Sequence, residues 1–348
     1  MSDTPNATVE NRSEIVFITD AQDCNPNGNP MGENRPRIDP VTNTAIVTDV
    51  RLKRYLRDQL ASDDHPIFVK KTGGESAVRA RLALDLFEDV ETVDDLDAID
   101  NISQEFLAKA TDVRYFGATL SFNVTDDELL EAVKEQFPSE FTGPVQFSPA
   151  RSMNAVETNE ESSKLTSVIA TQEDKEQGGF GLDDHRIKYG IFPFHGIVDE
   201  HGAEDTNLSS ADVERLDTLC WRSLKNQTLS RSKIGQEPRI YARVEYETPG
   251  YHLGDLHHGF SIDEDASEPD SEMRDVRDVI LDVTNFVEWV SDAADDIQTV
   301  HLVGSERLAI KYDGEEATAA DLPSILEAQG VSVHEIDVYD EFESTLAE

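Results

Sequence analysis

The stretch from Asn25 to Arg57 holds the residue types that could bind a chain of phosphates. Between Arg35 and Arg57 there are six basic side chains and two acidic ones, a surplus of four positive charges in a chain whose formal net charge is −42. Arginine suits phosphate because its planar guanidinium can donate two parallel hydrogen bonds to one phosphate group. The sequence therefore predicts that a polyanion binds to a set of cationic side chains: Arg35, Arg37, Arg51, Lys53, Arg54 and Arg57.

A helix must present four of these side chains. It is expected to begin at Thr48 or Asp49, either of which can cap it, and to run to about Leu60. At about 100° per residue, its apolar side chains lie on one arc and its basic side chains on the opposite arc. One face should therefore pack on the core, and the other should form a basic stripe. This stripe either binds phosphate or is a solvated helix face without a ligand.

A strand and a long loop precede this helix. Glu14–Thr19 is a short apolar run that predicts a buried strand, and residues 20–47 form a loop rich in Asn, Pro and Gly. A loop of that length inside a compact domain is usually functional. Asn25, Asn27 and Gly28 tolerate positive φ, so they either form turns only or offer backbone amides to the polyanion.

A second polar segment follows at residues 141–154, which predicts a strand, a turn and another polar loop. Phe147 in this segment is more typical of a core residue than of a binding residue. Lys233 lies in a further loop, after a helix that a capping box of Ser209 and Asp212 begins. These segments add five candidate contacts to the polyanion: Gln146, Arg151, Ser152, Asn154 and Lys233.

Three further strands are expected from apolar runs and alternation. They are Asp112–Phe122, Tyr189–Val198 and Ile240–Tyr246. Pro193 lies inside the second of them and indicates a bulge or a sheet edge, because proline donates no ladder hydrogen bond.

The remaining sequence predicts insertions around one main domain. A capping box of Thr125 and Glu128 precedes another helix. The stretch near 155–187 is polar, contains glycine and is interpreted as a mobile hairpin, and the stretch near 250–278 is acidic. The expected divisions are a disordered tail over 1–13 and a single domain over 14–348 with insertions near 61–111, 155–187 and 250–278.

The excess of acidic residues does not exclude a nucleic-acid partner. Acid is spread along the whole chain, and only 11 of the 30 basic residues are lysine, a pattern that resembles proteins of salt-in halophiles. At about 1 M salt the Debye length is roughly 3 Å, so local clusters say more about partners than global charge does. No apolar run reaches the roughly 18 residues of a membrane span, and the first residues lack a secretory signal. We therefore expect a cytoplasmic protein without a membrane partner.

One group of residues could be considered for metal binding. His252, Asp255, His257 and His258 lie close together in the sequence, but their spacing matches no known closed site. The sequence therefore predicts no metal and no cofactor.

The order of elements indicates an α+β fold. Strand–helix–strand followed by strand–helix–strand, with long inserts between them, fits the split βαβ plan of the ferredoxin-like or RRM-type fold. Sheets of that type are a frequent platform for RNA. Periodicity alone makes this fold one of several candidates.

Several motif blocks resemble one family in the same order along residues 14–246. They are Asp20 at the end of the first strand, NPNG-x-P at 25–30, NRPR-x-D at 34–39, the VTDVRLKR block at 47–58, Phe116–Gly117, GPVQF at 143–147, RS-x-N at 151–154 and SK-x-GQ at 232–236. On these blocks the chain resembles the backbone subunit of the CRISPR Cascade complex, in the RAMP superfamily. The type I-B, Csh-type branch is the most similar.

The resemblance implies a non-enzymatic subunit of an antiviral ribonucleoprotein. Several copies polymerise along one CRISPR guide RNA, each gripping the RNA backbone through an RRM-like palm. A thumb-like hairpin kinks the guide, and a helical finger region forms another insertion. The segments between kinks stay open to pair with a target DNA strand, so base pairing reads the sequence. Other Cascade subunits complete the complex.

Two alternatives remain. By its position before the first helix, Asp39 resembles the aspartate with which type III backbone subunits cut target RNA, which would make the chain a metal-dependent RNA endonuclease. No second carboxylate is evident near Asp39 in the sequence. A folded protein with no RNA role is the other alternative.

Overall fold

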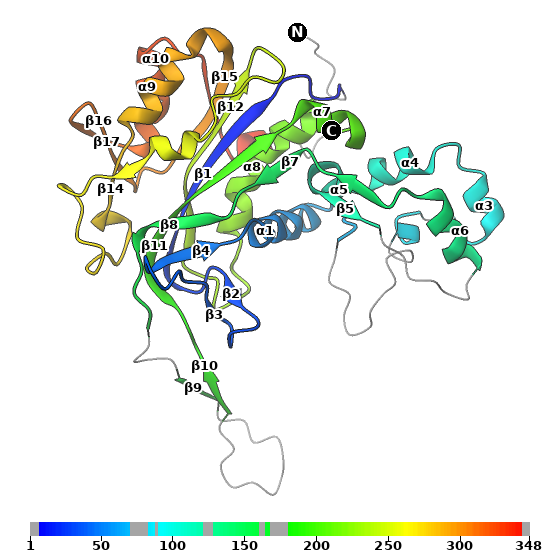
Figure 1. The fold of residues 1–348 in the computed structure, drawn as a ribbon, viewed down its shortest axis with the longest axis horizontal. Helices are drawn as coiled ribbons and strands as arrows, with labels where there is room; N and C mark the ends of the chain where they lie inside the picture. Colours follow the sequence, from blue (N-terminus) through cyan, green and yellow to red (C-terminus); the bar gives the residue numbers. More distant parts are fainter. Residues whose placement is uncertain are drawn as a thin grey trace, which may run out of the picture.

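The strand β1 (Ser13–Cys24) lies at the centre of the main sheet, and its first nine residues are buried. The computed structural model describes residues 7–69, 83–87, 90–120, 128–159, 164–167 and 180–342. Along most of its length β1 pairs antiparallel with β11 (Ile187–Val198) on one side and with β12 (Gln236–Tyr246) on the other. Figure 1 shows these long strands crossing the middle of the molecule.

Two interleaved strand–helix–strand units build this sheet. The order is β18 (Val333–Glu335), β15 (Ile297–Gly304), β12, β1, β11, β7 (Val145–Phe147). The helix α1 (Asp49–Ser62) lies in the chain between β1 and β7, and α8 (Ser210–Lys225) lies between β11 and β12. Each unit places one of its strands between the two strands of the other. The α+β class expected from the sequence is confirmed.

Alternation along β1 sorts two cores onto the two faces of the sheet. Ile15 and Phe17 pack in one core with the buried residues of α1 and α8. Val16 and Ile18 pack in the other core with the C-terminal part of the chain. That part holds a four-stranded sheet and two helices: β13 (Ser261–Ile262), β14 (Ile280–Asp282), β16 (Ala309–Tyr312), β17 (Glu315–Thr318), α9 (Thr284–Asp292) and α10 (Leu322–Ala328).

The insertion after α1 has a small core of its own. Phe106 and Phe137 pack edge to face at its centre, 5.3 Å apart between ring centroids. Figure 1 shows this part to the side of the main sheet. The insertion expected near 61–111 extends further along the chain, to about Thr142. Its described elements are α3 (Val93–Asp97), α4 (Ile102–Lys109), α5 (Thr111–Phe116), β5 (Gly117–Thr119), α6 (Glu128–Gln136) and β6 (Glu140–Thr142). Thr125 of the predicted capping box lies outside the described residues.

The prediction of a strand over Asp112–Phe122 is wrong for its first half, which is the helix α5. The carboxylate of Asp112 is buried and accepts hydrogen bonds from the backbone amides of Phe68 and Val69, at 2.8 and 3.1 Å. Gly117 ends the helix with a φ of 66°. A Cβ atom there would lie 2.2 Å from the carbonyl oxygen of Phe141, so only glycine fits. These long-range contacts outweigh the local strand pattern.

A paired hairpin lies within the predicted stretch near 155–187. Its strands β9 (Lys164–Ser167) and β10 (Phe180–Asp183) are antiparallel. Figure 1 shows them projecting below the ends of β8 (Ala150–Ala155) and β11. Residues 160–163 and 168–179 lie outside the described part.

The loop expected over 20–47 contains regular structure. β1 continues to Cys24, and three short strands follow: β2 (Gly28–Asn29), β3 (Arg35–Pro36) and β4 (Thr44–Val47). β2 pairs with β3, and β4 pairs with β8. The loop is therefore a folded platform at one end of β1.

The strand pairing decides between the two alternatives at Pro193, and the N-terminal contacts correct another expectation. Pro193 pairs with Ile18 in an unbroken register, so it makes no bulge. On the outer side of β11, β7 pairs only with Gly196–Val198, so Pro193 lies at an edge of the sheet, as the other alternative predicted. Residues 7–13 were expected to be part of a disordered tail. Instead, Val9 is buried and Arg12 forms ion pairs with two carboxylates.

The two helices that the capping residues predict and the last predicted strand are confirmed. α1 begins after the N-cap Thr48, and Ser209 with Asp212 forms the capping box of α8. The predicted strand at Ile240–Tyr246 lies within β12. The remaining short helices are α7 (Glu200–Thr206), η2 (Leu256–Gly259), η3 (Val276–Asp278), η4 (Ala294–Asp296) and η5 (Ala319–Asp321). Within the described residues, no helix combines the length and apolar character that a membrane span requires.

Candidate nucleic-acid interface

The helix α1 has the two faces that its sequence predicts. The hydroxyl of Thr48 accepts a hydrogen bond from the backbone amide of Arg51 at 3.4 Å and so caps the first turn. Leu52 and Leu56 are fully buried against α8 and the sheet. This packing fixes the rotation of the helix, and the rotation decides how the four basic side chains of the opposite arc are presented.

Arg57 lies in a buried ion pair and not on the expected exposed stripe. Its Nε donates to Oδ2 of Asp112 at 2.8 Å, and the Arg57 and Asp112 side chains are 14% and 0% exposed. The guanidinium also lies over the ring of Phe116, 5.2 Å from its centroid. Arg57 therefore ties α1 to α5, and its charge is already compensated by Asp112.

Arg51 is the most available cation of the helix. Its guanidinium lies 5.7 Å from the ring centroid of Tyr55, and among the described residues it has no carboxylate at ion-pair distance. Arg54 is partly exposed and pairs with Asp58, one turn later, at 2.6 Å. Lys53 is more enclosed, and this burial lowers the pKa of its ammonium group.

Lys53 connects the helix with the second predicted patch. Its Nζ donates to Oε1 of Gln146 at 2.6 Å, and Nζ lies 3.7 Å from the carboxylate of Asp49. Gln146 is exposed on β7 and also donates to the carbonyl of Gly143 at 2.7 Å. Two residues that were predicted separately are thus neighbours.

Asn25 and Asn27 shape the loop from the inside. The amide of Asn25 donates to the carbonyl of Asn34 at 2.7 Å, and the amide of Asn27 donates to the hydroxyl of Thr48 at 3.1 Å. Both side chains are buried, so they fold the loop instead of presenting polar groups at its surface. The backbone amide of Asn25 is also used within the protein, because it donates to the carbonyl of Ser232 at 2.8 Å, and this favours turn formation at Asn25.

The two loop arginines differ in their surroundings. Arg35 is well exposed and forms an exposed pair with Glu33 at 3.2 Å. Such a pair contributes little stability and can open for a stronger ligand. Arg37 is half-buried, and its Nε has no hydrogen-bond partner among the described residues. An orphan donor of this kind is expected to find an acceptor in a bound ligand or in water.

The end of the second polar segment is the strand β8, and of its three predicted polar side chains only one is exposed. Alternation along β8 buries Ser152 and Asn154 and exposes Arg151. The hydroxyl of Ser152 accepts from the amide of Ala45 at 2.9 Å. The side-chain oxygen of Asn154 accepts from the amide of Ile191 at 3.2 Å. Ser152 and Asn154 were expected in a loop that contacts RNA, and they instead fasten β8 to its neighbours.

Arg151 and Asp39 join the second patch to the loop. Nη1 of Arg151 lies 3.1 Å from Oδ2 of Asp39, and the other carboxylate oxygen accepts from the amide of Val41 at 2.9 Å. The hydrogen bond from Val41, with that from Arg151, lowers the pKa of Asp39. Asp39 is thus an ionised residue that orders its turn and orients Arg151.

Lys233 lies beneath this surface. Its Nζ donates to the backbone carbonyls of Asn25 and Pro26, the latter at 3.3 Å. Burial, together with the charge of Arg51, lowers the pKa of Lys233 to about 8. Lys233 thus joins the loop over residues 226–235 to the start of the Asn-rich loop.

Arg231 was not among the predicted residues, although it belongs to the same exposed surface. It precedes Lys233 by two residues, and its side chain is 58% exposed. Its Nη1 lies 3.7 Å from Asp184, at the base of the β9–β10 hairpin. The sequence signal that could have found it is the segment 226–235, which contains Arg231, Lys233 and no acidic residue.

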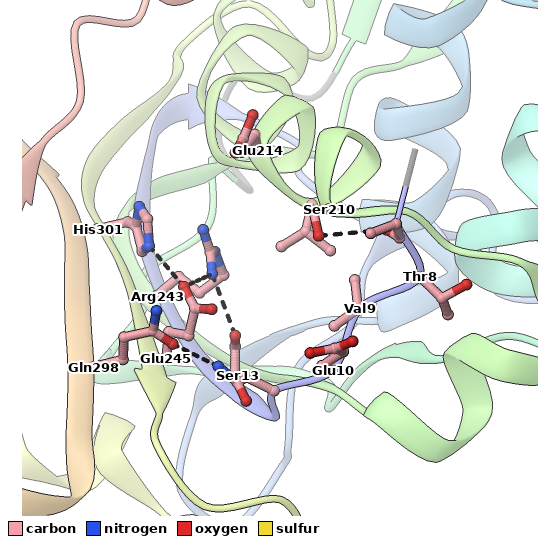
Figure 2. Close-up of a pocket in the computed structure, with 13 residues that line it drawn as sticks. Thr8, Val9, Glu10, Ser13, Ser210, Glu214, Arg243, Glu245, Gln298 and His301 are labelled. Carbon is pink, nitrogen blue, oxygen red and sulfur yellow. Dashed lines mark hydrogen bonds and ion pairs between the residues drawn. The ribbon is translucent and has the colours of Figure 1, made fainter. Parts of the chain in front are cut away.

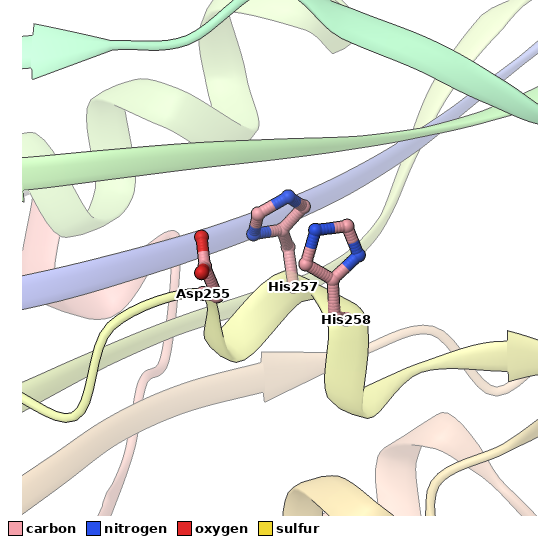
Figure 3. A group of neighbouring side chains, drawn as sticks. All are labelled: Asp255, His257 and His258. Carbon is pink, nitrogen blue, oxygen red and sulfur yellow. The ribbon is translucent and has the colours of Figure 1, made fainter.

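A histidine group lies elsewhere, on the turn of η2. One ligand atom from each of Asp255, His257 and His258 lies within 4.8 Å of the others, and Figure 3 shows their side chains together. His252 is not part of the group. Burial and two neighbouring imidazoles lower the pKa of His257 to about 4. The sequence predicts no metal here, and the geometry adds only that three possible ligands are neighbours.

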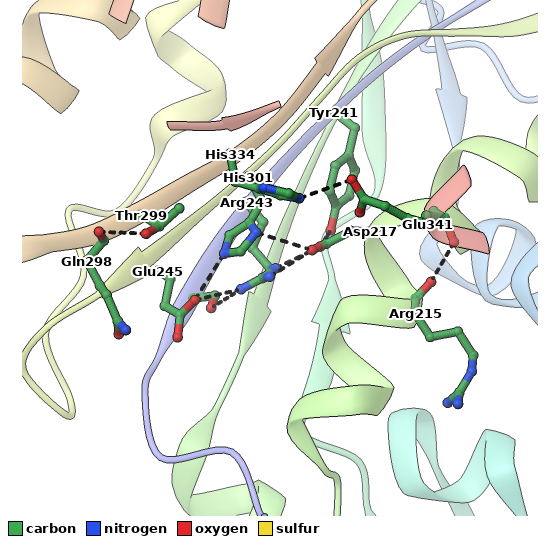
Figure 4. A network of polar contacts seen from close by, with 12 residues as sticks. Arg215, Asp217, Tyr241, Arg243, Glu245, Gln298, Thr299, His301, His334 and Glu341 are labelled. Atoms are coloured by element: carbon green, nitrogen blue, oxygen red, sulfur yellow. Dashed lines mark hydrogen bonds and ion pairs between the residues drawn. The ribbon is translucent and has the colours of Figure 1, made fainter. Parts of the chain in front are cut away.

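A polar cavity lies beside the N-terminal segment and is not suited to a polyanion. Its volume is about 240 Å³, and Glu10, Glu214 and Glu245 are among its lining residues. Figure 2 shows these acidic side chains around it. The one arginine of the lining, Arg243, is buried and donates to both carboxylate oxygens of Asp217 at 2.7 Å (Figure 4). The positive charge of Arg243 is therefore already compensated by Asp217.

The chain was compared with family models, with curated proteins and with solved structures. The family model of "CRISPR-associated protein Cas7" matches residues 11–284. A protein of Haloferax volcanii with the same description is 55% identical over 338 residues, which cover 96% of this chain and 98% of that protein. Two chains of solved structures described as a CRISPR RNA-guided surveillance complex, one of them pre-nicking, are similar at TM-scores of 0.49 and 0.42. Their sequence identities are 13% and 14%, and the matches cover 97% and 91% of this chain and 99% of each of those chains.

Proposed function

Because the chain belongs to the Cas7 family of CRISPR-associated proteins, we propose that it binds a CRISPR guide RNA as the backbone subunit of a type I Cascade interference complex. Several copies bind along one guide, and the bases between them pair with a target DNA strand. Its partners are the guide RNA, the target strand, further copies of itself and other Cascade subunits, in the cytoplasm. In this role it is a binding protein and not an enzyme.

One observation carries this proposal. Four arginines of an extremely acidic chain are exposed or partly exposed on the folded loop, the start of α1 and β8: Arg35, Arg37, Arg51 and Arg151. β4 pairs with β8, and Arg151 contacts Asp39, so these segments form one continuous structure. Guanidinium groups spread over such a surface suit successive phosphates of one strand. The acidic surroundings disfavour a second polyanion elsewhere.

The palm of this subunit is proposed to be of the ferredoxin-like or RRM type. The four strands β12, β1, β11 and β7 are all antiparallel to their neighbours. The two crossing helices α1 and α8 contribute to the same core, on one face. This order and this placement support the split βαβ plan. The β9–β10 hairpin is then the thumb, and the small helical core around Phe106 is the finger region.

The alternative function, RNA cleavage by Asp39, has less support. A carboxylate that cleaves with metal needs further ligands, or it must be free to act as a base. Asp39 instead accepts hydrogen bonds from Val41 and Arg151. Within the described residues, the group of potential metal ligands is at Asp255, His257 and His258, which does not include Asp39.

Charge reversal at Arg51 tests the proposal. We expect Arg51→Glu to abolish retention of guide RNA while thermal unfolding stays unchanged, because the guanidinium is not in a described ion pair. Arg307→Glu is the matched control, since Arg307 is exposed in the turn between β15 and β16. If Arg51→Glu retains RNA as well as Arg307→Glu does, the basic face is solvated and the proposed surface is wrong.

A further inference from the structure

Large apolar side chains are exposed on the same segments that carry the available arginines. Eight are exposed among the described residues, and five of them lie on the folded loop, the start of α1 and the loop 226–235. We call these five the apolar rim: Met31, Val41, Val50, Leu229 and Ile234. Met31 and Leu229 are about as exposed as in an extended chain, at 95% and 102%. Such clustering on a soluble surface marks an interaction site.

The segments that carry the apolar rim are tied together by the backbone. The backbone amide of Gln22 donates to the carbonyl of Gly235 at 2.7 Å, and the backbone amide of Asn25 donates to the carbonyl of Ser232 at 2.8 Å. Lys233 adds its side-chain bonds to the carbonyls of Asn25 and Pro26. The backbone of the loop 226–235 is therefore fastened to residues 22–26, at the start of the folded loop.

Cations alternate with the apolar rim. Val50 precedes Arg51, Leu229 and Ile234 flank Arg231 and Lys233, and the segment 226–235 has no acidic residue. A ligand that matches this surface has an anionic backbone and flat apolar groups. Unpaired RNA has both, because every base presents a π-face next to a phosphate chain. A protein partner has no anionic backbone, so it would have to match the cations with acidic side chains.

Concentrated salt weakens ionic contacts to RNA but not apolar ones. At about 1 M salt, where the Debye length is roughly 3 Å, ion pairs between arginine and phosphate lose most of their strength. Contacts between an aliphatic side chain and a base face are not screened. A subunit that works in concentrated salt therefore needs such contacts to retain an RNA strand.

We propose that the apolar rim binds the faces of unpaired guide-RNA bases, while Arg51 and Arg231 hold the adjacent phosphates. This inference rests on the proposed function and assigns binding roles to Leu229, Arg231 and Ile234. Leu229 and Ile234 contribute affinity that salt does not reduce. Arg231 contributes affinity that salt does reduce.

Affinity as a function of salt separates the two contributions. The binding of wild type and of the Leu229→Ala/Ile234→Ala double variant to a short unstructured RNA is measured between about 0.2 and 2 M potassium chloride. We expect the double variant to bind about tenfold more weakly at every salt concentration, a loss of about 1.4 kcal/mol, with an unchanged slope of log K against log salt. Arg231→Ala should instead reduce that slope by about one.

Tyr339→Ala is the matched control for the double variant, because Tyr339 is exposed and lies in the C-terminal segment outside the apolar rim. Circular dichroism checks that all variants are folded. If the double variant binds RNA as tightly as wild type, the inference is wrong but the proposed function stands. The same holds if the double variant alters the slope of log K against log salt. If the double variant loses self-association in sedimentation but keeps its RNA affinity, the apolar rim binds a second copy, and the inference is wrong. No RNA binding by wild type at any salt concentration overturns both the inference and the proposed function.

Discussion

Replacing Arg57 by alanine should destabilise the protein and leave its RNA affinity intact. Arg57 is the charged partner of Asp112, whose side chain is fully buried. Removing one member of a buried pair leaves an uncompensated charge and costs roughly 3–5 kcal/mol. Asp112 keeps two hydrogen bonds from the backbone amides of Phe68 and Val69, so the lower end of that range applies, about 3 kcal/mol.

Urea unfolding at constant potassium chloride concentration measures this loss. Arg54→Ala is the control on the same helix, since its pair with Asp58 is partly exposed and contributes at most about 1 kcal/mol. Adding Asp112→Asn to Arg57→Ala should recover part of the stability, because the buried charge is removed while an oxygen still accepts from the backbone amides. RNA affinity is compared under conditions in which each variant is folded.

Two results would refute this account of Arg57. One is a loss of stability no larger than that of Arg54→Ala, which would mean that the pair with Asp112 is not buried as described. The other is a loss of RNA affinity in Arg57→Ala that exceeds the loss in Arg54→Ala. Arg57 would then be a phosphate ligand, as the helical pattern first predicted.

Three further predictions concern catalysis, acid stability and assembly. Asp39→Ala and wild type should both leave a guide-complementary RNA intact in the presence of Mg²⁺, and cleavage by wild type that Asp39→Ala loses would support the nuclease alternative. Burial would raise the pKa of Glu245, but the hydrogen bond from His301, followed by the charge of Arg243, lowers it to about 2. The stability that Glu245 contributes should therefore be complete above about pH 4.5 and fall as the pH drops towards 2. Glu245→Gln should flatten this pH dependence, and an equally steep loss of stability in that variant would contradict the prediction. In about 2 M potassium chloride an isolated subunit should bind RNA weakly while the assembled filament keeps its guide, because adjacent copies add avidity, and equal loss from both would exclude cooperative retention.

Capping residues and apolar periodicity predicted the elements that depend on residues close together in the sequence. The N-cap Thr48 and the apolar period of α1 are both sequence-local, and the helix forms where they place it. The capping box of Ser209 and Asp212 is an equally local device. The apolar alternation from Ile240 to Tyr246 in β12 is also local to one strand, although both faces of that strand are buried. The helix that carries part of the candidate surface could therefore be predicted.

Contacts between distant segments decided the features that were missed. Arg57 and Asp112 are 55 residues apart, and nothing near either residue in the sequence reveals the pair. Asn154 was assigned to a loop, yet its side chain bonds the backbone of β11, 37 residues later. The composition of a basic stripe thus predicted which residue types gather at the surface. It did not predict which of these side chains already form ion pairs or hydrogen bonds within the protein.

The content of the native complex tests the central claim most directly. The assembled protein is purified in concentrated potassium chloride, and the RNA that accompanies it is extracted and sequenced. We predict an RNA of one defined length that carries CRISPR guide sequences, and its loss from the Arg51→Glu variant. A preparation without RNA, or with RNA of many lengths that mirrors total cellular RNA, would contradict the claim that this chain is the backbone of a guide-RNA complex.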